Sequence, residues 1–528
     1  MHFSTRSARG MVVAPHHLAS EAGLAVLREG GNAIEAMIAA ASTIAVVYPH
    51  MNSIGGDGFW LIHEPGKRPV AIDACGKSGA EVSPALYGKA GLKAIPARGP
   101  LAANTVAGTL SGWEHALTKS AEWGGSLPLS RLLEDAIEYA NEGVPVTVSQ
   151  HDNTVGKRAE LEPIPGFSDA FMPTGVPAVG SRFRQPRLGQ TLRQLATNGI
   201  NDFYQGALAR AVANDLQRAG SPITAADLRA HRAEWVEPLA LKTSQGELFN
   251  FPPPTQGLAS LMILGAYDRM VPSSADGFDY VHRLVEATKQ AFMIRDREVT
   301  DPAFMTSNPN DFLQPKALDA MTDAVDHAQA LPWPHPSAQG DTVWLGAVDS
   351  AGRAVSFIQS IYWEFGAGVV LEDTGVLWQN RGSSFQLSGD AKQALAPGRK
   401  PFHTLNPALC QFNDGRVLTY GTMGGEGQPQ TQAMVYSRYA YHGMGIQESI
   451  SAPRWLLGRT WGAESTTLKL ESRFSPSLLE ALRNAGHDVE VADDFDPVMG
   501  HAGAIVRYPD GTLEGGADPR SDGRAAGF

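Results

Sequence analysis

The pattern of apolar and polar positions is clearest between residues 340 and 360, where two runs of strand length follow one another. Apolar side chains alternate with small or polar ones over 343–347 and again over 355–357. The three residues Ser350-Ala351-Gly352 between the runs favour a turn, because glycine adopts positive φ angles at little steric cost. The pattern therefore predicts a β-hairpin.

The predicted turn also sets the register of this hairpin. If the loop has three residues, Asp349 faces Arg353, and counting outward places Thr342 opposite Ser360 at the open end. The Pro-rich stretch 330–340 directly before this threonine is expected to be a loop. A threonine at the mouth of a hairpin, behind such a loop, is where the nucleophile of a self-cleaving precursor would lie.

Helical and strand periods follow one another along the rest of the chain. Residues 18–30 and 33–47 have helical period, and Asn32 with Glu35 three residues later is a capping-box start for the second helix. A second hairpin is expected over 59–73. Helices followed by a β-ribbon indicate a layered fold. Further helices are expected in three longer stretches: 111–143, 186–219 and 280–297.

The titratable residues outside the hairpin have structural interpretations. In the last helical stretch, His282, Glu286 and Lys289 share one polar face, which we expect to be exposed to solvent. Cys75 and Cys410 stand far apart with no Cys-x-x-Cys, so we expect buried, unreactive thiols. No histidines or carboxylates have the spacing of a metal motif, and we predict neither a metal site nor a cofactor.

Composition narrows the classes of function. Of 528 residues, 43% are hydrophobic and 19% are charged, so the chain can bury a large core. The net charge of −12, with no basic run, argues against nucleic-acid binding. No apolar stretch is long enough to cross a membrane, and the first residues lack the apolar segment of an export signal. We therefore expect a cytoplasmic protein without a membrane partner.

Several motifs occur in one order along the chain. They are the Asp341-Thr342 pair, the run Ala-Val-Asp-x-x-Gly-x-Ala-Val at 347–355, the run 365–370, the pair Gly424-Gly425, and Asp518-Pro519-Arg520. Together they resemble the γ-glutamyltransferase family of N-terminal-nucleophile hydrolases, from Gly23 to the C-terminus. The resemblance implies an α+β, four-layer αββα sandwich made as a precursor. Cleavage would give a large subunit, 1–341, and a small subunit, 342–528, interleaved in one structural domain.

The resemblance implies that Thr342 is the nucleophile, and the chemistry of threonine agrees. Its hydroxyl needs a base, and cleavage after Asp341 would free an α-amino group with a pKa of about 7.7–8.0 that can accept the proton. The same hydroxyl would first attack the carbonyl of Asp341 and give an ester that water cleaves. The resemblance assigns the oxyanion hole to Gly424 and Gly425, since backbone N–H groups without a Cβ can approach a substrate oxygen. A tight turn is the alternative for these glycines.

Arg98 stands shortly before the Val-Ala-Gly run that ends at Gly108. From the residues alone, an exposed arginine before a helix is the more frequent case. In the family, an arginine in such a stretch holds the α-carboxylate of the substrate, and a planar guanidinium can bind a carboxylate through two parallel hydrogen bonds. The resemblance therefore assigns Arg98 to carboxylate binding.

The chain departs from the family pattern at substrate-binding positions. Ser360 and Tyr362 stand where the transferases carry Thr and Asn on the strand opposite the nucleophile. Ser384 replaces the acidic residue that binds the substrate's α-amino group, Arg381 stands nearby, and His403-Thr404 replaces a Ser-Ser pair. An amine-bearing γ-glutamyl group would lose its counter-ion here. A small amide with a carboxylate and no amine fits better, whether Arg381 faces the site or solvent.

The whole pattern is most similar to family members that hydrolyse oxamate to oxalate and ammonia in nitrogen salvage from purine rings. It favours a self-processing threonine amidohydrolase that acts on a small carboxylate-bearing amide. Three alternatives stay open: a γ-glutamyltransferase or glutathione hydrolase, a glutaryl-type acylase, and an unprocessed, non-enzymatic binding protein on the same fold. Assembly into a homodimer of processed heterodimers also stays open.

Overall fold

The fold is built around two seven-stranded antiparallel sheets. The computed structural model describes residues 3–335, 340–459 and 465–528. The first sheet has the order β1 (Thr5–Ser7), β18 (Leu513–Ala517), β17 (Ala502–Arg507), β13 (Val417–Thr422), β12 (Ala408–Phe412), β9 (Gly246–Asn250), β8 (Leu239–Lys242). The second has the order β19 (Arg524–Gly527), β2 (Met11–Ala14), β10 (Asp341–Val348), β11 (Ala354–Tyr362), β3 (Asp57–His63), β4 (Val70–Ala74), β7 (Glu234–Val236).

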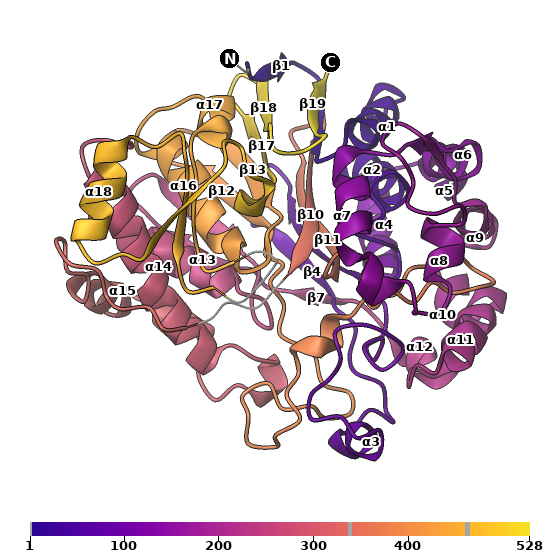
Figure 1. The fold of residues 1–528 in the computed structure, drawn as a ribbon. Helices are drawn as coiled ribbons and strands as arrows, with labels where there is room; N and C mark the ends of the chain where they lie inside the picture. Colours follow the sequence, from indigo (N-terminus) through magenta and orange to yellow (C-terminus); the bar gives the residue numbers. More distant parts are fainter. Residues whose placement is uncertain (1–2, 336–339, 460–464) are drawn as a thin grey trace.

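The inner faces of the two sheets pack against each other. Phe59 and Ile358 of the second sheet share one buried apolar cluster with Leu409 and Ile505 of the first. Helices lie outside both sheets, so that the molecule has a helix–sheet–sheet–helix cross-section (Figure 1). The predicted α+β fold with four αββα layers is therefore confirmed.

Trp344 of β10 is the largest side chain between the sheets, and the facing sheet makes room for it with glycine. A Cβ atom added at Gly421 or at Gly503 would lie 2.1 or 2.4 Å from the indole ring. The indole nitrogen donates a hydrogen bond to Ser356 Oγ at 2.9 Å. These contacts fix the strand that begins at the predicted cleavage site.

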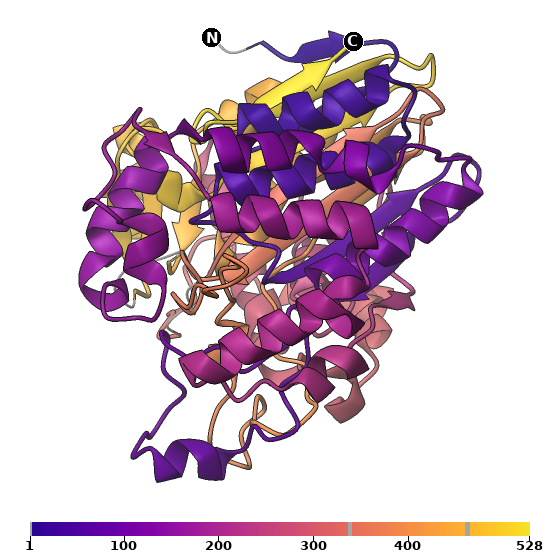
Figure 2. The same cartoon turned by 90° about the vertical axis from the view of Figure 1, so that its right-hand side faces the viewer.

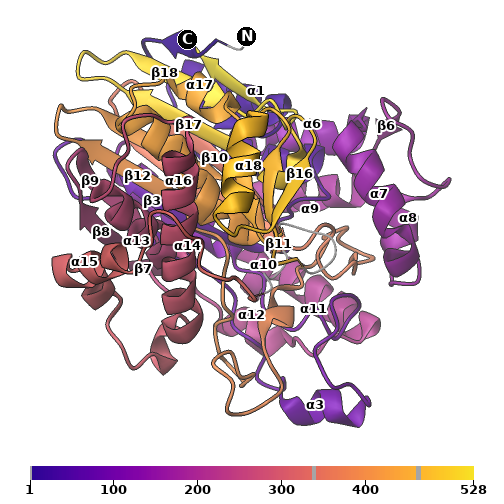
Figure 3. The same cartoon turned by 60° about the vertical axis from the view of Figure 1, so that its left-hand side comes forward.

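The outer helices pack against the sheets either directly or through another helix. The second sheet is covered by α1 (His17–Arg28), α2 (Ala33–Val47), α4 (Thr109–Glu122), α6 (Glu134–Glu142), α9 (Pro186–Asn198) and α11 (Ala207–Ala219), which Figure 2 shows in indigo to magenta. The first is covered by α13 (Gly257–Asp268), α14 (Phe278–Glu298), α16 (Gln428–Ala440) and α17 (Ile446–Ser451) (Figure 3).

Shorter elements connect these layers. The helices are α3 (Pro84–Lys89), α5 (Leu129–Leu132), α7 (Val148–Leu161), α8 (Phe167–Phe171), α10 (Asp202–Gln205), α12 (Ala225–Ala230), α15 (Pro315–Asp323) and α18 (Pro476–Asn484). The strands are β5 (Val144–Pro145), β6 (Arg182–Phe183), β14 (Trp455–Leu457), β15 (Leu468–Glu471) and β16 (Val489–Ala492). The 3-10 turns are η1 (Pro302–Phe304), η2 (Pro309–Leu313), η3 (Arg381–Ser384), η4 (Gly425–Gly427) and η5 (Pro497–Met499). In the described ranges, no helix combines the length and the apolar character that crossing a bilayer requires.

The predicted capping box at the start of α2 is confirmed. Asn32 Oδ1 accepts a hydrogen bond from the backbone of Glu35 at 3.1 Å, and Glu35 Oε2 accepts one from the backbone of Asn32 at 2.8 Å. Every residue of α2 is buried. The hairpins predicted over 59–73 and 340–360 are also present, as β3–β4 and β10–β11.

The prediction that the polar face of α14 is exposed to solvent is wrong. His282, Glu286 and Lys289 are all buried, with 2% or less of each side chain exposed. Lys289 Nζ binds Glu286 Oε1 at 2.7 Å and the carbonyl of Leu331 at 2.6 Å, while His282 Nδ1 contacts His487 Nε2 at 2.9 Å. The polar face is therefore covered by the segment that leads to the predicted cleavage site, and its charges are paired.

Candidate active site

Thr342 lies at an irregularity in the pairing of β10 with β11. The predicted register holds as far as Val343, whereas Asp341 pairs with Tyr362, one position further along. Such a bulge changes the direction of a side chain. The hydroxyl groups of Thr342 and Ser360 still meet, because Thr342 Oγ1 donates to Ser360 Oγ at 3.3 Å. The predicted nucleophile is thus buried, with 1% of its surface exposed.

Gln428 also contacts this hydroxyl and was missed by the sequence analysis. Its Nε2 donates to Thr342 Oγ1 at 3.4 Å. Gln428 is the first residue of α16 and directly follows the glycine turn η4. The start of a helix after that turn was the signal that could have identified it.

Gly424 and Gly425 adopt φ angles of +122° and +51°, which other residues rarely adopt. Gly340, two positions before Thr342, packs directly on this turn. A Cβ atom added at Gly425 would lie 2.8 Å from the Gly340 carbonyl oxygen. The chain entering the predicted cleavage site therefore lies against the predicted oxyanion hole.

A buried hydrogen-bond network holds the glycine turn in place. Gln256 Nε2 donates to the carbonyl oxygens of Gly425 at 2.7 Å and of Thr404 at 2.8 Å. Arg295 of α14 donates to Gln256 Oε1 and to Glu426 Oε2, both at 3.0 Å. These contacts fix the peptide orientation on which an oxyanion hole depends.

Arg381 points into the site, which answers the question left open by the sequence. Its side chain is 1% exposed, and its Cζ lies 3.9 Å from the centre of the Tyr362 ring. Nη1 donates to Thr404 Oγ1 at 3.4 Å, whereas Nη2 has no hydrogen-bond partner among the residues that the structure describes. Burial lowers the pKa of Arg381 to about 10, so that it stays cationic at neutral pH.

Arg381 lies close to the chain before the cleavage site. A Cβ atom added at Gly340 would be 3.2 Å from Thr404 Oγ1 and 3.3 Å from Tyr362 Cε2, the two groups that contact the guanidinium. Tyr362 has a positive φ of 82°, a strained conformation for a bulky residue. The unpartnered guanidinium nitrogen therefore belongs to the same small region as Thr342 and the glycine turn.

Asp57, a residue the sequence analysis did not single out, lies beside His403. Asp57 Oδ1 accepts hydrogen bonds from the backbone of Gly76 at 2.9 Å and from Gln379 Nε2 at 3.1 Å. Its Oδ2 lies 3.4 Å from His403 Nε2. Burial raises the pKa of Asp57 to about 7 and lowers that of His403 well below its ordinary value. The pair faces Arg381, whose cation opposes the rise in the pKa of Asp57.

Among the described residues, two buried groups contain three potential metal ligands each: Asp57, Cys75 and His403, and His282, Glu286 and His487. Arg381 faces the first group, and Lys289 is bonded to a carboxylate of the second. These cations oppose a divalent ion, so we assign neither group to a metal. Both cysteines are free and buried, as predicted, and burial raises the pKa of Cys410 to about 12.

Arg98 is bound to other groups of the protein. Its Nη1 donates to the carbonyl oxygens of Glu364 at 2.6 Å and of Gly366 at 2.5 Å. Nε and Nη2 donate to Glu160 at 3.3 and 3.2 Å. All three guanidinium nitrogens are thus bound to protein groups. These contacts brace the loop at Glu364 and Gly366, and the role of Arg98 in carboxylate binding stays a prediction.

A cavity of about 520 Å³ opens outside Tyr362. Ser384 lies in its wall together with Arg295, Glu426 and Arg459. The Ser384 hydroxyl donates to the carbonyl of Phe402 at 3.4 Å. Ser384 is therefore placed in the approach to the site, and not beside Thr342.

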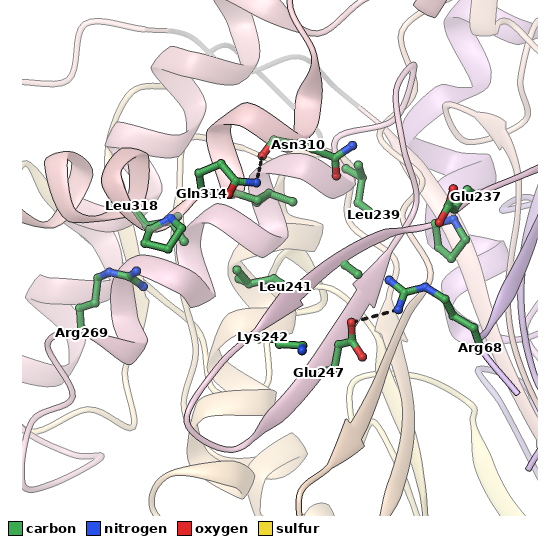
Figure 4. A pocket seen from close by; sticks show the side chains of 14 residues that line it. Arg68, Glu237, Leu239, Leu241, Lys242, Glu247, Arg269, Asn310, Gln314 and Leu318 are labelled. Carbon is green, nitrogen blue, oxygen red and sulfur yellow. Dashed lines mark hydrogen bonds and ion pairs between the residues drawn. The ribbon is translucent and has the colours of Figure 1, made fainter. Parts of the chain in front are cut away.

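A separate pocket of about 480 Å³ lies against the edge strand β8 (Figure 4). Arg68 and Glu247 form an ion pair at 3.3 Å there, and Gln314 donates to the carbonyl of Asn310 at 3.1 Å. None of the predicted site residues lines it. We therefore place the candidate site at Thr342.

Comparison with known proteins agrees with this placement. The Gamma-glutamyltranspeptidase family model matches residues 19–528. The chain belongs to this family. It is 57% identical to the oxamate amidohydrolase proenzyme of Klebsiella pneumoniae subsp. pneumoniae over 530 residues, covering all of both chains. It is 41% identical to the glutathione hydrolase-like YwrD proenzyme of Bacillus subtilis, again over all of both chains.

Among solved structures, the cephalosporin acylase from Bacillus halodurans is similar to this chain with a TM-score of 0.91 and 32% identity. The match covers 100% of this chain and 97% of the acylase. The family therefore includes proteins named for different amide substrates.

Proposed function

We propose that this chain is a self-processing threonine amidohydrolase that hydrolyses oxamate to oxalate and ammonia. The observation that carries the proposal is the packing of Gly340 on Gly425 beside the Thr342 hydroxyl. It brings together a nucleophile, a scissile segment and candidate oxyanion donors. The whole-length similarity to an oxamate amidohydrolase proenzyme supports this choice of substrate.

Processing begins with attack of Thr342 Oγ1 on the carbonyl carbon of Asp341. The N–H groups of the glycine turn stabilise the oxyanion, the hydroxyl proton passes to the α-nitrogen of Thr342 as the C–N bond breaks, and the resulting ester is hydrolysed by water. The products are a large subunit, 1–341, and a small subunit, 342–528. These would stay interleaved, because β10 pairs with β2 and β11 pairs with β3.

Turnover uses the same groups on an external amide. The freed α-amino group of Thr342 accepts the hydroxyl proton as Oγ1 attacks the amide carbon. The backbone of Gly424 and Gly425 stabilises the oxyanion, and the leaving nitrogen takes the proton and departs as ammonia. Water then hydrolyses the acyl-enzyme. Ser360 and Gln428 orient the hydroxyl, as their hydrogen bonds to it indicate.

Arg381 binds the carboxylate of the substrate in this proposal. Beside the segment that cleavage would release, it has a buried N–H group that no described residue accepts a hydrogen bond from. Thr404, Tyr362 and His403 surround the guanidinium and complete the recognition side. A γ-glutamyl substrate would bring a positively charged amine towards a buried cation, which disfavours γ-glutamyl transfer.

A glutaryl-type acylase is the second candidate, because of the cavity of about 520 Å³ outside Tyr362. That volume exceeds what ammonia as a leaving group requires. Ser384 would then contact the larger leaving group. An enzyme of this kind would release an amine from a glutaryl amide faster than it releases ammonia from oxamate.

Substitution of the nucleophile tests the proposal directly. Thr342→Ala should leave a full-length chain on a denaturing gel and no ammonia release from oxamate, while Thr342→Ser should retain part of both activities. Release from glutamine alone by the wild-type protein would instead identify a γ-glutamyl enzyme. An intact wild-type chain without amidase activity would favour the binding protein.

Assembly and location complete the proposal. The homodimer of processed heterodimers and the cytoplasmic location stay predictions from the sequence. Light scattering of the purified protein measures the first. Fractionation of cells that express the chain measures the second, with the full-length precursor and the processed subunits followed on the same gel.

A further inference from the structure

We propose that the substrate carboxylate enters the site together with one proton, which the Asp57–His403 pair accepts. This inference rests on the proposed binding of the carboxylate to Arg381. It adds a charge-balancing role for two residues that do not contact Thr342 in the described structure. The step is a proton transfer from solvent to Asp57 Oδ2, with no other bond made or broken.

The geometry forms a row of groups whose polar atoms lack hydrogen-bond partners. Within the described ranges, Arg381 Nη2, Asp57 Oδ2 and both ring nitrogens of His403 are buried without one. Asp57 Oδ2 and His403 Nε2 are nevertheless only 3.4 Å apart. A proton on Oδ2 would allow Asp57 to donate to the imidazole and would satisfy two of these atoms together.

The charges explain why the proton should arrive with the substrate. Without a ligand, the Asp57 carboxylate balances the buried Arg381 cation. A substrate carboxylate on Arg381 would leave two anions against one cation in a region from which water is excluded, which is unfavourable. Protonation of Asp57 restores the balance. Because burial already raises the pKa of Asp57 to about 7, this proton is taken up readily near neutral pH.

The other ionisable groups around the pair are poorly placed to take this role. Lys400 is bonded to Asp73 at 2.7 Å, so these two charges offset each other. Burial raises the pKa of the remaining neighbours, which therefore stay neutral: Cys75, Tyr204 and Tyr362. Asp57 with its partner His403 is thus the group that can change its charge near pH 7.

Because the ligand and the proton bind together in this proposal, the affinity for the ligand should depend on pH. A ligand that binds with one proton loses affinity as pH rises above the pKa of the free group, by about tenfold per pH unit at the limit. Binding of a monoanionic amide or of oxalate should therefore weaken steadily above about pH 7. Below that pH, Asp57 is already protonated and the affinity should become independent of pH.

Calorimetry of oxalate binding to the purified, processed protein tests this. Titrations at pH 8 in two buffers of different ionisation enthalpy give the number of protons taken up. Asp57→Asn is the matched variant, because the amide keeps the acceptor for Gly76 and Gln379 and resembles the protonated acid towards His403. Both proteins keep the α-amino group of Thr342, so any protons that it takes up appear in both.

On binding oxalate, the wild-type protein should take up nearly one proton more than the Asp57→Asn variant. At pH 8.5, the Asp57→Asn variant should bind oxalate at least tenfold more tightly than the wild-type protein. Equal uptake in the two proteins, or no binding of oxalate by a protein that hydrolyses oxamate, would overturn the inference. A protein that binds oxalate with the expected uptake but never hydrolyses oxamate would instead refute the proposed reaction alone.

Infrared difference spectroscopy covers the case in which Asp57→Asn does not fold. Addition of oxalate to the wild-type protein at pH 8, with isotope-labelled aspartate, should produce the C=O stretch of a protonated carboxylic acid. A spectrum without this band would contradict the inference. The Arg381→Gln variant serves as the control and should show no such band at the same oxalate concentration.

Discussion

The two sides of the candidate site are built in different ways. The reaction side, formed by Thr342, Gly424 and Gly425, consists of one strand end and one tight turn that meet where Gly340 packs on the turn. The recognition side brings Arg381, at the start of η3, and His403, in a loop, to the first residue of β3, Asp57. In the proposed function, the first side acts on an amide carbonyl, including the chain's own, whereas the second selects the substrate.

Because the two sides are built differently, substitutions should be able to affect turnover of a substrate without affecting self-cleavage. Processing uses a carbonyl that is already held in place by the fold, so it requires only the reaction side. Turnover of a small amide also needs a charged group to hold it. A substitution on the reaction side should therefore abolish both activities, and one on the recognition side should reduce turnover alone.

Of the substitutions considered, Gly425→Ala should cause the largest loss of both precursor cleavage and amidase activity. The φ of +51° disfavours a side chain, and the new Cβ would lie 2.8 Å from the Gly340 carbonyl oxygen. Loss of oxyanion donors costs about 10²–10³ in kcat. We expect a mostly uncleaved precursor on a denaturing gel and a comparable loss of amidase activity. Normal cleavage with normal turnover would show that this turn is not the oxyanion hole.

Arg381→Gln should have the second largest effect, and it should reduce turnover without reducing processing. Loss of one partner of a buried charge pair costs about 2–5 kcal/mol, so kcat/KM for oxamate should fall by about 30-fold or more. Cleavage into subunits should be complete. Steady-state kinetics on the processed variant measures the first effect, and a variant that also fails to process would place Arg381 on the reaction side.

Thr404→Val should have a smaller effect of the same kind. Its hydroxyl accepts a hydrogen bond from Arg381 Nη1 at 3.4 Å and helps to orient the guanidinium. One such bond contributes about 0.5–1.5 kcal/mol, which corresponds to a roughly 2–10-fold loss in kcat/KM. The loss should disappear when the substitution is made in the Arg381→Gln background, and additive losses would argue against this coupling.

Arg98→Gln should have the smallest effect on catalysis. The side chain is bound to two backbone carbonyls and to Glu160, so its loss should loosen a loop and lower the thermal midpoint. We expect KM for oxamate to stay within a few-fold of the wild-type value. A large increase in KM with an unchanged midpoint would restore Arg98 as the carboxylate anchor.

Arg98 and Arg381 show how far the sequence could predict the site. The hairpin, the capping box at Asn32 and the glycine turn follow local patterns, so they could be predicted from neighbouring residues. The role of a guanidinium depends on which acceptors surround it. Glu364 and Gly366 occupy Arg98 from more than 260 positions away, and no local pattern reports such contacts.

The same limit explains the residues that were missed or misjudged. The polar face of α14 was expected to be exposed because helical period cannot show that Leu331 and His487 cover it. Asp57 and Gln256 gain their importance from partners more than 140 positions away. Buried polar groups of this kind need the fold before their function can be assigned.

The central claim is that Arg381 recognises the carboxylate of the substrate while the threonine performs the reaction. The most direct test compares kcat/KM for oxamate with that for oxamide, its neutral analogue, in the wild-type protein and in Arg381→Gln. The account predicts a large loss for oxamate and little change for oxamide, so that the preference for the acid collapses. Equal losses for both substrates would contradict it and would assign Arg381 to the structure of the site alone.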